Sequence, residues 1–300
     1  MASAPRLTRR ALGLCLGAGA LLLATLIPAL PASAAPPRHQ SSWAGSNYLA
    51  LGDSVAFGYV PPQAKPPPNY NNPKSFVGYP EDLGRALGAH VVNASCPGET
   101  TISMLAAGGQ SNGCENSVGS PIGYRTLFPL HVKYSGTQTA FAVNYLEHHN
   151  TKLVTIDIGA NDGFVCQETT ADHCTSGPEL TALIAQIEQN LTTIYQQLRD
   201  VAHYHGRIVA LTYYSTDYAN ALDTLEVELL NSAIVPVTEQ FGGTIADGFQ
   251  AFKVASKHFG GNPCRAGLLI KLPGGTCNIH PSPTGHLLLA AAIAQAIGAN

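Results

Sequence analysis

Short apolar, β-branched runs alternate along the chain with longer segments whose apolar residues recur at helical spacing. The short runs have the length of buried strands, and most of them end in Gly or Ser. They predict five strands, Asn47–Gly52, His90–Ser95, Lys152–Gly159, Arg207–Tyr214 and Gly242–Gly248. Helical spacing predicts helices over residues 78–88, 178–206, 216–241 and 284–298.

Strands that alternate with helices are joined by crossovers, which produce a parallel sheet with helices on both faces. The pattern therefore predicts an α/β fold, a single domain in three layers (α/β/α) around a parallel sheet of about five strands. Ligands bind such a sheet at the carboxyl ends of its strands. The segments Tyr59–Ser75, rich in Pro and Asn, and Gly113–Tyr134 interrupt the pattern and are predicted to be long loops.

The N-terminal residues predict export. Three arginines before residue 11 precede an apolar run that ends at the small residues Ala32-Ser33-Ala34, which fit a cleavage site. We expect a signal peptide over 1–34, an N-terminal extension over 35–46 and one domain over 47–300, and hence a secreted protein. An uncleaved membrane anchor is the alternative, because the apolar run approaches spanning length. The choice between the general and the twin-arginine export routes stays open.

Composition and charge narrow the classes of protein further. The chain is 45% hydrophobic and 12% charged, which favours a large core and excludes disorder. A formal net charge of −3 offers no basic surface, so we expect no nucleic-acid partner. We expect a monomer.

The cysteines after residue 34 predict disulfides. Their number is even, as in the disulfide frameworks of exported proteins. Six cysteines allow 15 pairings, and we favour the sequential pairs because each closes a loop rich in Gly, Ser, Asn or Pro: Cys96–Cys114, Cys166–Cys174 and Cys264–Cys277. A zinc site is the alternative, but no Cys-x-x-Cys spacing occurs, and no metal is expected.

Residues that can perform acyl transfer follow three of the predicted strands. Ser54 follows the first strand, Gly98 the second and Asn161 the third. His280 lies near the C-terminus. In acyl transfer a serine attacks a carbonyl carbon and a histidine takes its proton. Amide N–H groups then stabilise the oxyanion, each by roughly 3–4 kcal/mol when well aimed.

These residues occur in four blocks that resemble the SGNH hydrolase superfamily, also called the GDSL lipases and esterases. The matching blocks are Gly52-Asp53-Ser54-Val55, Gly98, Gly159-Ala160-Asn161-Asp162 and His280-Pro281, in the family's order. Valine stands where the commonest form of the first block has leucine. The layout of the six cysteines further resembles secreted actinobacterial members. The resemblance implies a flavodoxin-like sheet and no cofactor.

By this resemblance Ser54 is the nucleophile and His280 the general base. The oxyanion hole would consist of the backbone amides of Ser54 and Gly98 and the side chain of Asn161. The family usually has Asp three residues before the histidine, but here that position is Cys277. We therefore expect a Ser-His dyad in which a backbone carbonyl, that of Cys277, orients the imidazole.

Structural roles compete with catalytic ones at several positions. We expect Asp53 to satisfy the turn amides beside the nucleophile, and a helix-capping role is the alternative for Asn161. His286 has helical spacing in the last helix and is expected to be packed. The histidines at 148–149 and at 203 and 205 lack a carboxylate or cysteine at ligand spacing, so we expect them to be solvated.

The sequence thus predicts a secreted serine hydrolase that cleaves carboxylic esters through an acyl-enzyme on Ser54. An acyltransferase with the same site is one alternative, and a non-catalytic lipid- or carbohydrate-binding protein on the hydrolase fold is another. The ester substrate stays open among lipids, phospholipids and acetylated sugars. The loops Tyr59–Ser75 and Gly113–Tyr134 are expected to form an apolar groove for the acyl chain.

Overall fold

The structure is a computed structural model, and it describes residues 43–299. The predicted signal peptide over 1–34 and most of the predicted extension over 35–46 lie outside these residues. Trp43, at the end of that extension, is packed into the hydrophobic core, so the folded part begins before residue 47.

The central sheet has five parallel strands in the order β2-β1-β3-β4-β5. They are β1 (Asn47–Gly52), β2 (His90–Asn93), β3 (Thr151–Asp157), β4 (Arg207–Leu211) and β5 (Thr244–Ala246). Leu49 of β1 pairs with Val92 on one side and with Val154 on the other. All five predicted strands are present, and β2 to β5 end two or three residues early because the chain turns there into the loops of the site.

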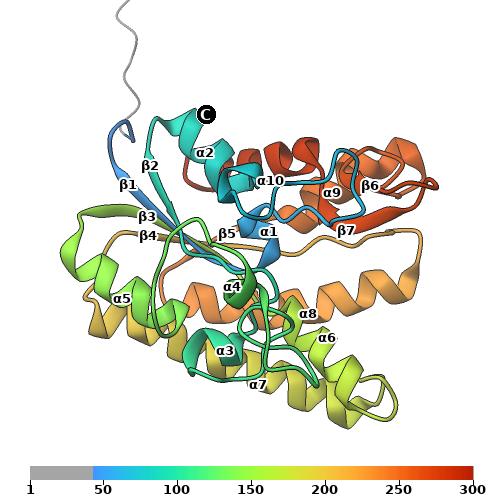
Figure 1. Cartoon of the computed structure of the whole chain (residues 1–300), viewed down its shortest axis with the longest axis horizontal. Helices are drawn as coiled ribbons and strands as arrows, with labels where there is room; N and C mark the ends of the chain where they lie inside the picture. The colour runs from blue at the N-terminus through green and yellow to red at the C-terminus, as the bar shows by residue number, and fades with distance from the viewer. Residues whose placement is uncertain (1–42, 300) are drawn as a thin grey trace, which may run out of the picture. The chain divides into compact units, whose positions relative to one another are not determined.

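Helices cover both faces of the sheet, which confirms the predicted three layers (Figure 1). On one face α2 (Tyr79–Leu87), α9 (Gly248–Ser256) and α10 (Pro283–Ala296) pack together. The opposite face carries α3 (Thr101–Leu105), α5 (Gln138–His148), α7 (Gly177–Gln196) and α8 (Ala221–Gln240). None of the helices within residues 43–299 is both long and apolar enough to cross a membrane.

Helix α7 shows why the sequence signal for these helices was clear. Ser176 caps the helix through a hydrogen bond from the Glu179 N–H, and Pro178 stands in the first turn, where its missing N–H costs nothing. One stripe of apolar residues, including Ile187, Leu191 and Ile194, is buried toward the core.

Three short helices lie in the segments that follow the strands and in the second insertion. They are α1 (Ser54–Phe57), α4 (Tyr124–Leu127) and α6 (Ala160–Thr169). A small antiparallel hairpin, which the sequence analysis did not predict, joins β6 (Leu269–Lys271) to β7 (Cys277–Pro281). The Tyr214 hydroxyl donates a 2.8 Å hydrogen bond to the Ile279 carbonyl, which ties β7 to the segment after β4.

The disulfides join neighbouring cysteines, as predicted: Cys96–Cys114, Cys166–Cys174 and Cys264–Cys277. The two predicted loops pack against each other. Tyr70 from the first and Phe128 from the second have ring centroids 4.9 Å apart, and both contact a small core of Phe57, Phe76 and Tyr124.

Candidate active site

The turn after β1 determines where Ser54 lies. Asp53 caps α1, because its Oδ1 accepts a 2.8 Å hydrogen bond from the Val55 N–H. Gly52 has φ +139°, and a Cβ there would lie 2.3 Å from the Asp157 carbonyl oxygen. Only glycine permits this turn. Ser54 therefore begins a helix at the carboxyl edge of the sheet.

The imidazole of His280, in β7, faces this serine. Its Nε2 lies 2.8 Å from Ser54 Oγ. The ring of Tyr59 packs against the imidazole with a centroid distance of 4.9 Å. The bridge Cys264–Cys277 joins β7, which carries His280, to the segment before β6. Serine and histidine are thus within hydrogen-bonding distance, as proton transfer between them requires.

The other ring nitrogen of His280 has a different partner from the predicted one. Nδ1 donates a short hydrogen bond to Oδ1 of Asn278, and the same oxygen accepts the His280 backbone N–H at 3.1 Å. The prediction that the Cys277 carbonyl orients the imidazole is therefore wrong. A proton on Nδ1 leaves Nε2 to accept the proton of the Ser54 hydroxyl.

Burial keeps the imidazole neutral. Loss of solvation lowers the pKa of His280 to about 4. Its partner Asn278 is uncharged and adds no attraction that would raise this pKa. At neutral pH the ring is consequently a free base that can accept a proton.

Two backbone N–H groups beside Ser54 are available to bind an oxyanion. Within the part of the chain that the structure describes, the amides of Ser54 and Gly98 donate no hydrogen bond to the protein. Gly98 has φ +82°, and a Cβ there would lie 2.4 Å from the Asn112 carbonyl oxygen, so this loop requires glycine.

The side chain of Asn161, at the start of α6, lines the same cavity as Ser54 and Gly98. Its Oδ1 accepts a 2.9 Å hydrogen bond from Asn112 Nδ2, and its Nδ2 donates to Asp53 Oδ2 at 3.2 Å. These two bonds fix which end of the amide is the donor. The bond to Asp53 uses one of the two hydrogens of Nδ2, and the other can be donated to a ligand in the cavity that Asn161 and Ser54 both line.

Two buried aspartates lie behind the nucleophile. Burial raises the pKa of Asp53 to about 6, although hydrogen bonds from the Tyr213 hydroxyl, at 2.6 Å, and from the Val55 amide oppose the rise. Burial, and then the charge on Asp53, raises the pKa of Asp157 well above its usual range. Tyr79 donates a 2.6 Å hydrogen bond to Asp157. Asp53 thus supports the turn and Asn161 rather than contacting the reacting atoms.

A cavity of about 710 Å³ opens at the serine. Ser54, Gly98, Asn161 and His280 all line it. The remainder of its wall is largely apolar and comes from α6, α7 and α8, with Phe164, Leu183, Ile187, Val227 and Leu230. The two long loops contribute only Tyr59, Gly113 and Tyr124. The predicted apolar groove is therefore formed mainly by helices and not by these loops.

Comparison with known proteins decides the family. The model of the GDSL-like lipase/acylhydrolase family matches residues 50–288. The chain belongs to the GDSL-like lipase/acylhydrolase family. It is accordingly a carboxylic ester hydrolase.

Solved structures share the fold of this GDSL-like hydrolase. An α/β hydrolase enzyme from the metagenome of Lake Arreo, Spain, is 18% identical, with a TM-score of 0.54 over 85% of this chain and 96% of that chain. The acetylxylan esterase Axe2 from Geobacillus stearothermophilus is 16% identical, with a TM-score of 0.52 over 85% and 95%. The lipase Lip_vut3 from a goat rumen metagenome is 14% identical, with a TM-score of 0.51 over 84% and 97%. No curated protein sequence matches the chain.

Several polar residues of this GDSL-like enzyme lie away from the contacts of Ser54, as the sequence predicts for the three histidines among them. Asp162 is buried and accepts hydrogen bonds from the Thr101 amide and hydroxyl. His286 is buried in α10, and burial lowers its pKa to about 3. The side chains of His148 and His149 are exposed and bond carbonyl oxygens one helical turn earlier.

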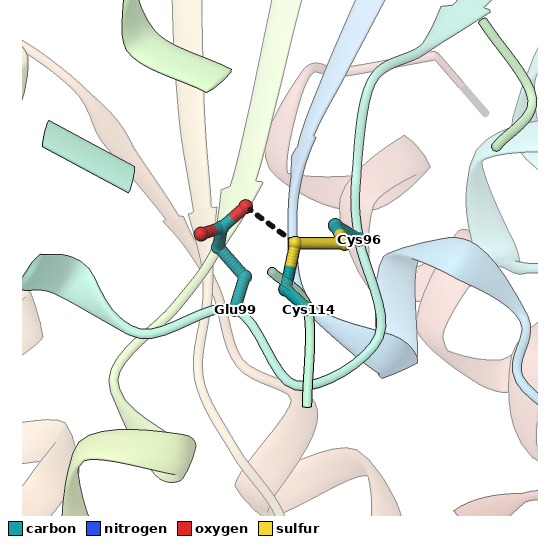
Figure 2. A group of neighbouring side chains, drawn as sticks. All are labelled: Cys96, Glu99 and Cys114. Atoms are coloured by element: carbon teal, nitrogen blue, oxygen red, sulfur yellow. Dashed lines mark hydrogen bonds between the residues drawn. A yellow bond between two sulfur atoms is a disulfide. The ribbon is translucent and has the colours of Figure 1, made fainter. Parts of the chain in front are cut away.

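Figure 2 shows a buried group of Cys96, Glu99 and Cys114, which lies beside Gly98 in the sequence. It is the only group of three metal-ligand side chains that lie close together among residues 43–299. Both sulfurs belong to the disulfide Cys96–Cys114, so neither is a thiolate that could bind a metal. Cys114 Sγ lies 3.4 Å from Glu99 Oε2, and burial raises the pKa of Glu99 to about 7.

Four polar side chains of this site were missed in the sequence. Asn278, Asn112, Tyr213 and Gln138 each bond a predicted site residue or its neighbour. None belongs to a block of the family pattern. Only the place of Asn278, two residues before the histidine, could have suggested its role. The side chain of an asparagine commonly forms a hydrogen bond with the backbone two residues later.

Proposed function

We propose that this protein is a secreted esterase that hydrolyses esters of apolar acyl chains, with Ser54 as nucleophile and His280 as general base. The observation that carries the proposal is the 2.8 Å contact between Ser54 Oγ and His280 Nε2 at the mouth of an apolar cavity. The three disulfides support secretion, because such bonds persist in oxidising compartments.

The proposed reaction has two halves. Ser54 Oγ attacks the ester carbonyl carbon while its proton passes to His280 Nε2, and the carbonyl oxygen becomes an oxyanion. The amides of Ser54 and Gly98 and the Asn161 side chain donate hydrogen bonds to this oxyanion. Its collapse expels the alcohol, which takes the proton from Nε2. Water then gives a proton to Nε2, attacks the acyl-enzyme and releases the acid, and Ser54 recovers its proton.

The shape of the cavity supports apolar acyl chains longer than acetyl. An acetyl group would fill only a small part of a 710 Å³ cavity and would leave the apolar wall of α7 and α8 uncovered. Burial of each methylene against such a wall contributes about 0.8 kcal/mol, so a longer chain binds better until the cavity is full. Axe2, which shares the fold, is an acetylxylan esterase. This chain is proposed to prefer longer acyl groups.

The nucleophile is tested by labelling and by substitution. We expect a fluorophosphonate probe to label Ser54, identified by peptide mapping, and we expect Ser54→Ala to abolish labelling and ester hydrolysis while far-UV circular dichroism stays unchanged. A non-catalytic binding protein would not label. Turnover at the wild-type rate by the folded Ser54→Ala protein would contradict the assignment.

The acyl preference is tested with p-nitrophenyl esters of increasing chain length and with Leu183→Trp. Leu183 lies on α7 at the wall of the cavity, so the larger indole should exclude long chains. We expect kcat/KM to rise from acetyl to medium chains in the wild type and Leu183→Trp to move the optimum to shorter chains. Adding an alcohol acceptor separates hydrolysis from acyl transfer. A preference for acetyl in the wild type would contradict the chain-length proposal.

A further inference from the structure

Gln138 lies between the loop that carries the nucleophile and the loop that carries Gly98. It is the first residue of α5, after the capping residue Thr137, and its side chain is fully buried. A glutamine at the first position of a helix usually points to solvent, because polar side chains pay a desolvation cost when buried without partners. The buried position therefore requires specific hydrogen bonds.

Three hydrogen bonds satisfy the buried amide. Oε1 accepts from the Gly52 N–H at 2.6 Å, and Nε2 donates to the Gly52 carbonyl at 3.0 Å. The second hydrogen of Nε2 goes to Glu99 Oε2, also at 3.0 Å. Gly52 stands two residues before Ser54, and Glu99 follows Gly98 directly. One side chain thus joins the two segments whose backbone amides face the substrate.

We infer that Gln138 is a positioning residue that fixes the spacing between the backbone amides of Ser54 and Gly98. The inference rests on the proposed function, since these amides matter only if they bind an oxyanion. Past the register pairing of β1 and β2, which ends at Ala50 and Asn93, the Cys96 N–H still donates a 3.1 Å hydrogen bond to the Gly52 carbonyl. The backbone thus holds the first part of the segment after β2, and Glu99, three residues after Cys96, needs a link of its own. Gln138 supplies such a link by acting on Gly52 as a neighbouring strand would.

The far end of the link is itself held. Glu99 is buried and accepts a short hydrogen bond from the Ser103 hydroxyl, and the disulfide Cys96–Cys114 lies against it (Figure 2). A donor bound to a fixed carboxyl group cannot shift without breaking a buried bond. Gln138 therefore connects Gly52 to a rigid anchor and not to a mobile side chain.

Removal of the link should reduce catalysis more than substrate binding. In Gln138→Met a side chain of similar length loses all three hydrogen bonds. A displacement of about 1 Å in a reacting geometry costs on the order of 100-fold in rate. We expect kcat to fall by roughly 10–100-fold, KM to change by less than about threefold, and the rate of fluorophosphonate labelling at Ser54 to fall in parallel with kcat.

A second pair of variants tests the link without removing the polar groups. Gln138→Glu places a carboxylate against Glu99 and loses the donor that joins them, so kcat should fall. Adding Glu99→Gln supplies a donor from residue 99 in place of the lost one. The double variant should then have a kcat at least about tenfold higher than Gln138→Glu alone, in line with the cost of one misaimed donor. This comparison remains possible if Gln138→Met does not fold.

Thr238→Val is the matched control for stability. It removes the buried Thr238 hydroxyl, which bonds the Tyr195 hydroxyl and the Ile234 carbonyl at 2.8 Å each and does not line the cavity. It should lower Tm with kcat unchanged. Equal kcat in the wild type and in folded Gln138→Met, or an equal fall in Thr238→Val, would overturn this inference alone. A wild-type protein that is not labelled at Ser54 would overturn the proposed function together with it.

Discussion

At the scale of single residues, the partner of the histidine sets this site apart from the pattern that the sequence suggested. Ser54, Gly98, Asn161 and His280 could be proposed from the sequence because each stands in a recognisable block, and the first three also follow a predicted strand. Asn278 could not, because an asparagine in a short turn has many local uses and its side-chain direction depends on the hairpin around it. A neutral amide can orient the imidazole but contributes no charge to stabilise an imidazolium.

Substitution of Asn278 should therefore separate orientation from charge. In Asn278→Ala the Nδ1 proton loses its acceptor, and we expect kcat to fall by roughly 10–100-fold, less than the 10²–10⁴-fold that loss of the base itself can cost. His280→Ala is the comparison variant, and His286→Ala, in α10, should keep most activity. Wild-type kcat in Asn278→Ala would mean that another group orients the ring.

The pH dependence of kcat/KM tests the charge state of the His280 imidazole. His280 must be neutral to accept a proton, and burial lowers its pKa to about 4, so kcat/KM should be level above about pH 5 and fall as the pH drops through about 4. Asn278→Asp places a carboxylate beside Nδ1 and should raise this pKa by about 1–3 units. The acid limb of the profile should then move upward, as measured with a soluble short-chain ester. An unchanged limb would contradict the assignment of that limb to His280.

At the scale of elements, the predictable parts are those with long apolar patterns. The strands β1 and β3 are buried along nearly their whole length and appear in the sequence as continuous apolar runs. The hairpin β6–β7 was missed because its strands are short, partly exposed and separated by Pro and Gly. It nevertheless carries His280, the proposed general base, so its attachment to the domain determines the geometry of the site.

The disulfides should differ in their effect on catalysis. Cys277 lies in β7, three residues before His280, and its bridge to Cys264 joins β7 to the segment before β6. Asn161, near the bridge Cys166–Cys174, is already held by Asn112 and Asp53. We expect the double variant Cys264→Ser/Cys277→Ser to lower kcat by about 10-fold or more, and Cys166→Ser/Cys174→Ser to leave kcat within about twofold.

Each of these double variants should also lose about 2–4 kcal/mol of stability in the chain-entropy description of disulfides. Chemical denaturation of both, alongside kinetics below their unfolding transitions, separates stability from geometry. An equal loss of kcat in the two variants would contradict the distinction between the bridges.

At the scale of the whole molecule, buried titratable groups link stability to pH in opposite directions. Burial raises the pKa of Asp53 and Asp162 to about 6 and of Glu99 to about 7, so their contribution to stability grows as the pH falls from about 7 toward 4. The contribution of His286 to stability has the opposite pH dependence. Burial, and then the charge of His280, lowers its pKa from 6.5 to about 3.

The unfolded chain therefore takes up a proton at this histidine near pH 6.5, whereas the folded protein does so only near 3. The associated stability is present above about pH 6.5 and is lost as the pH falls toward about 3. Relative to the wild type, His286→Leu should gain about 1.4 kcal/mol per pH unit between about pH 6 and 4, measured by urea unfolding. His258→Leu, at an exposed position, is the control, and an equal gain there would contradict the assignment.

The pairing of the disulfides also affects how the unfolded chain reaches the folded state. From Cys96 onward each cysteine is joined to its nearest neighbour in sequence, at separations of 18, 8 and 13 residues. The entropy lost on closing a loop grows with its length, so these pairings are also the ones an unfolded chain makes most readily. The three loops neither overlap nor enclose one another, and no bridge requires the chain to thread through another. They can consequently close in any order, and an early bridge does not block a later one.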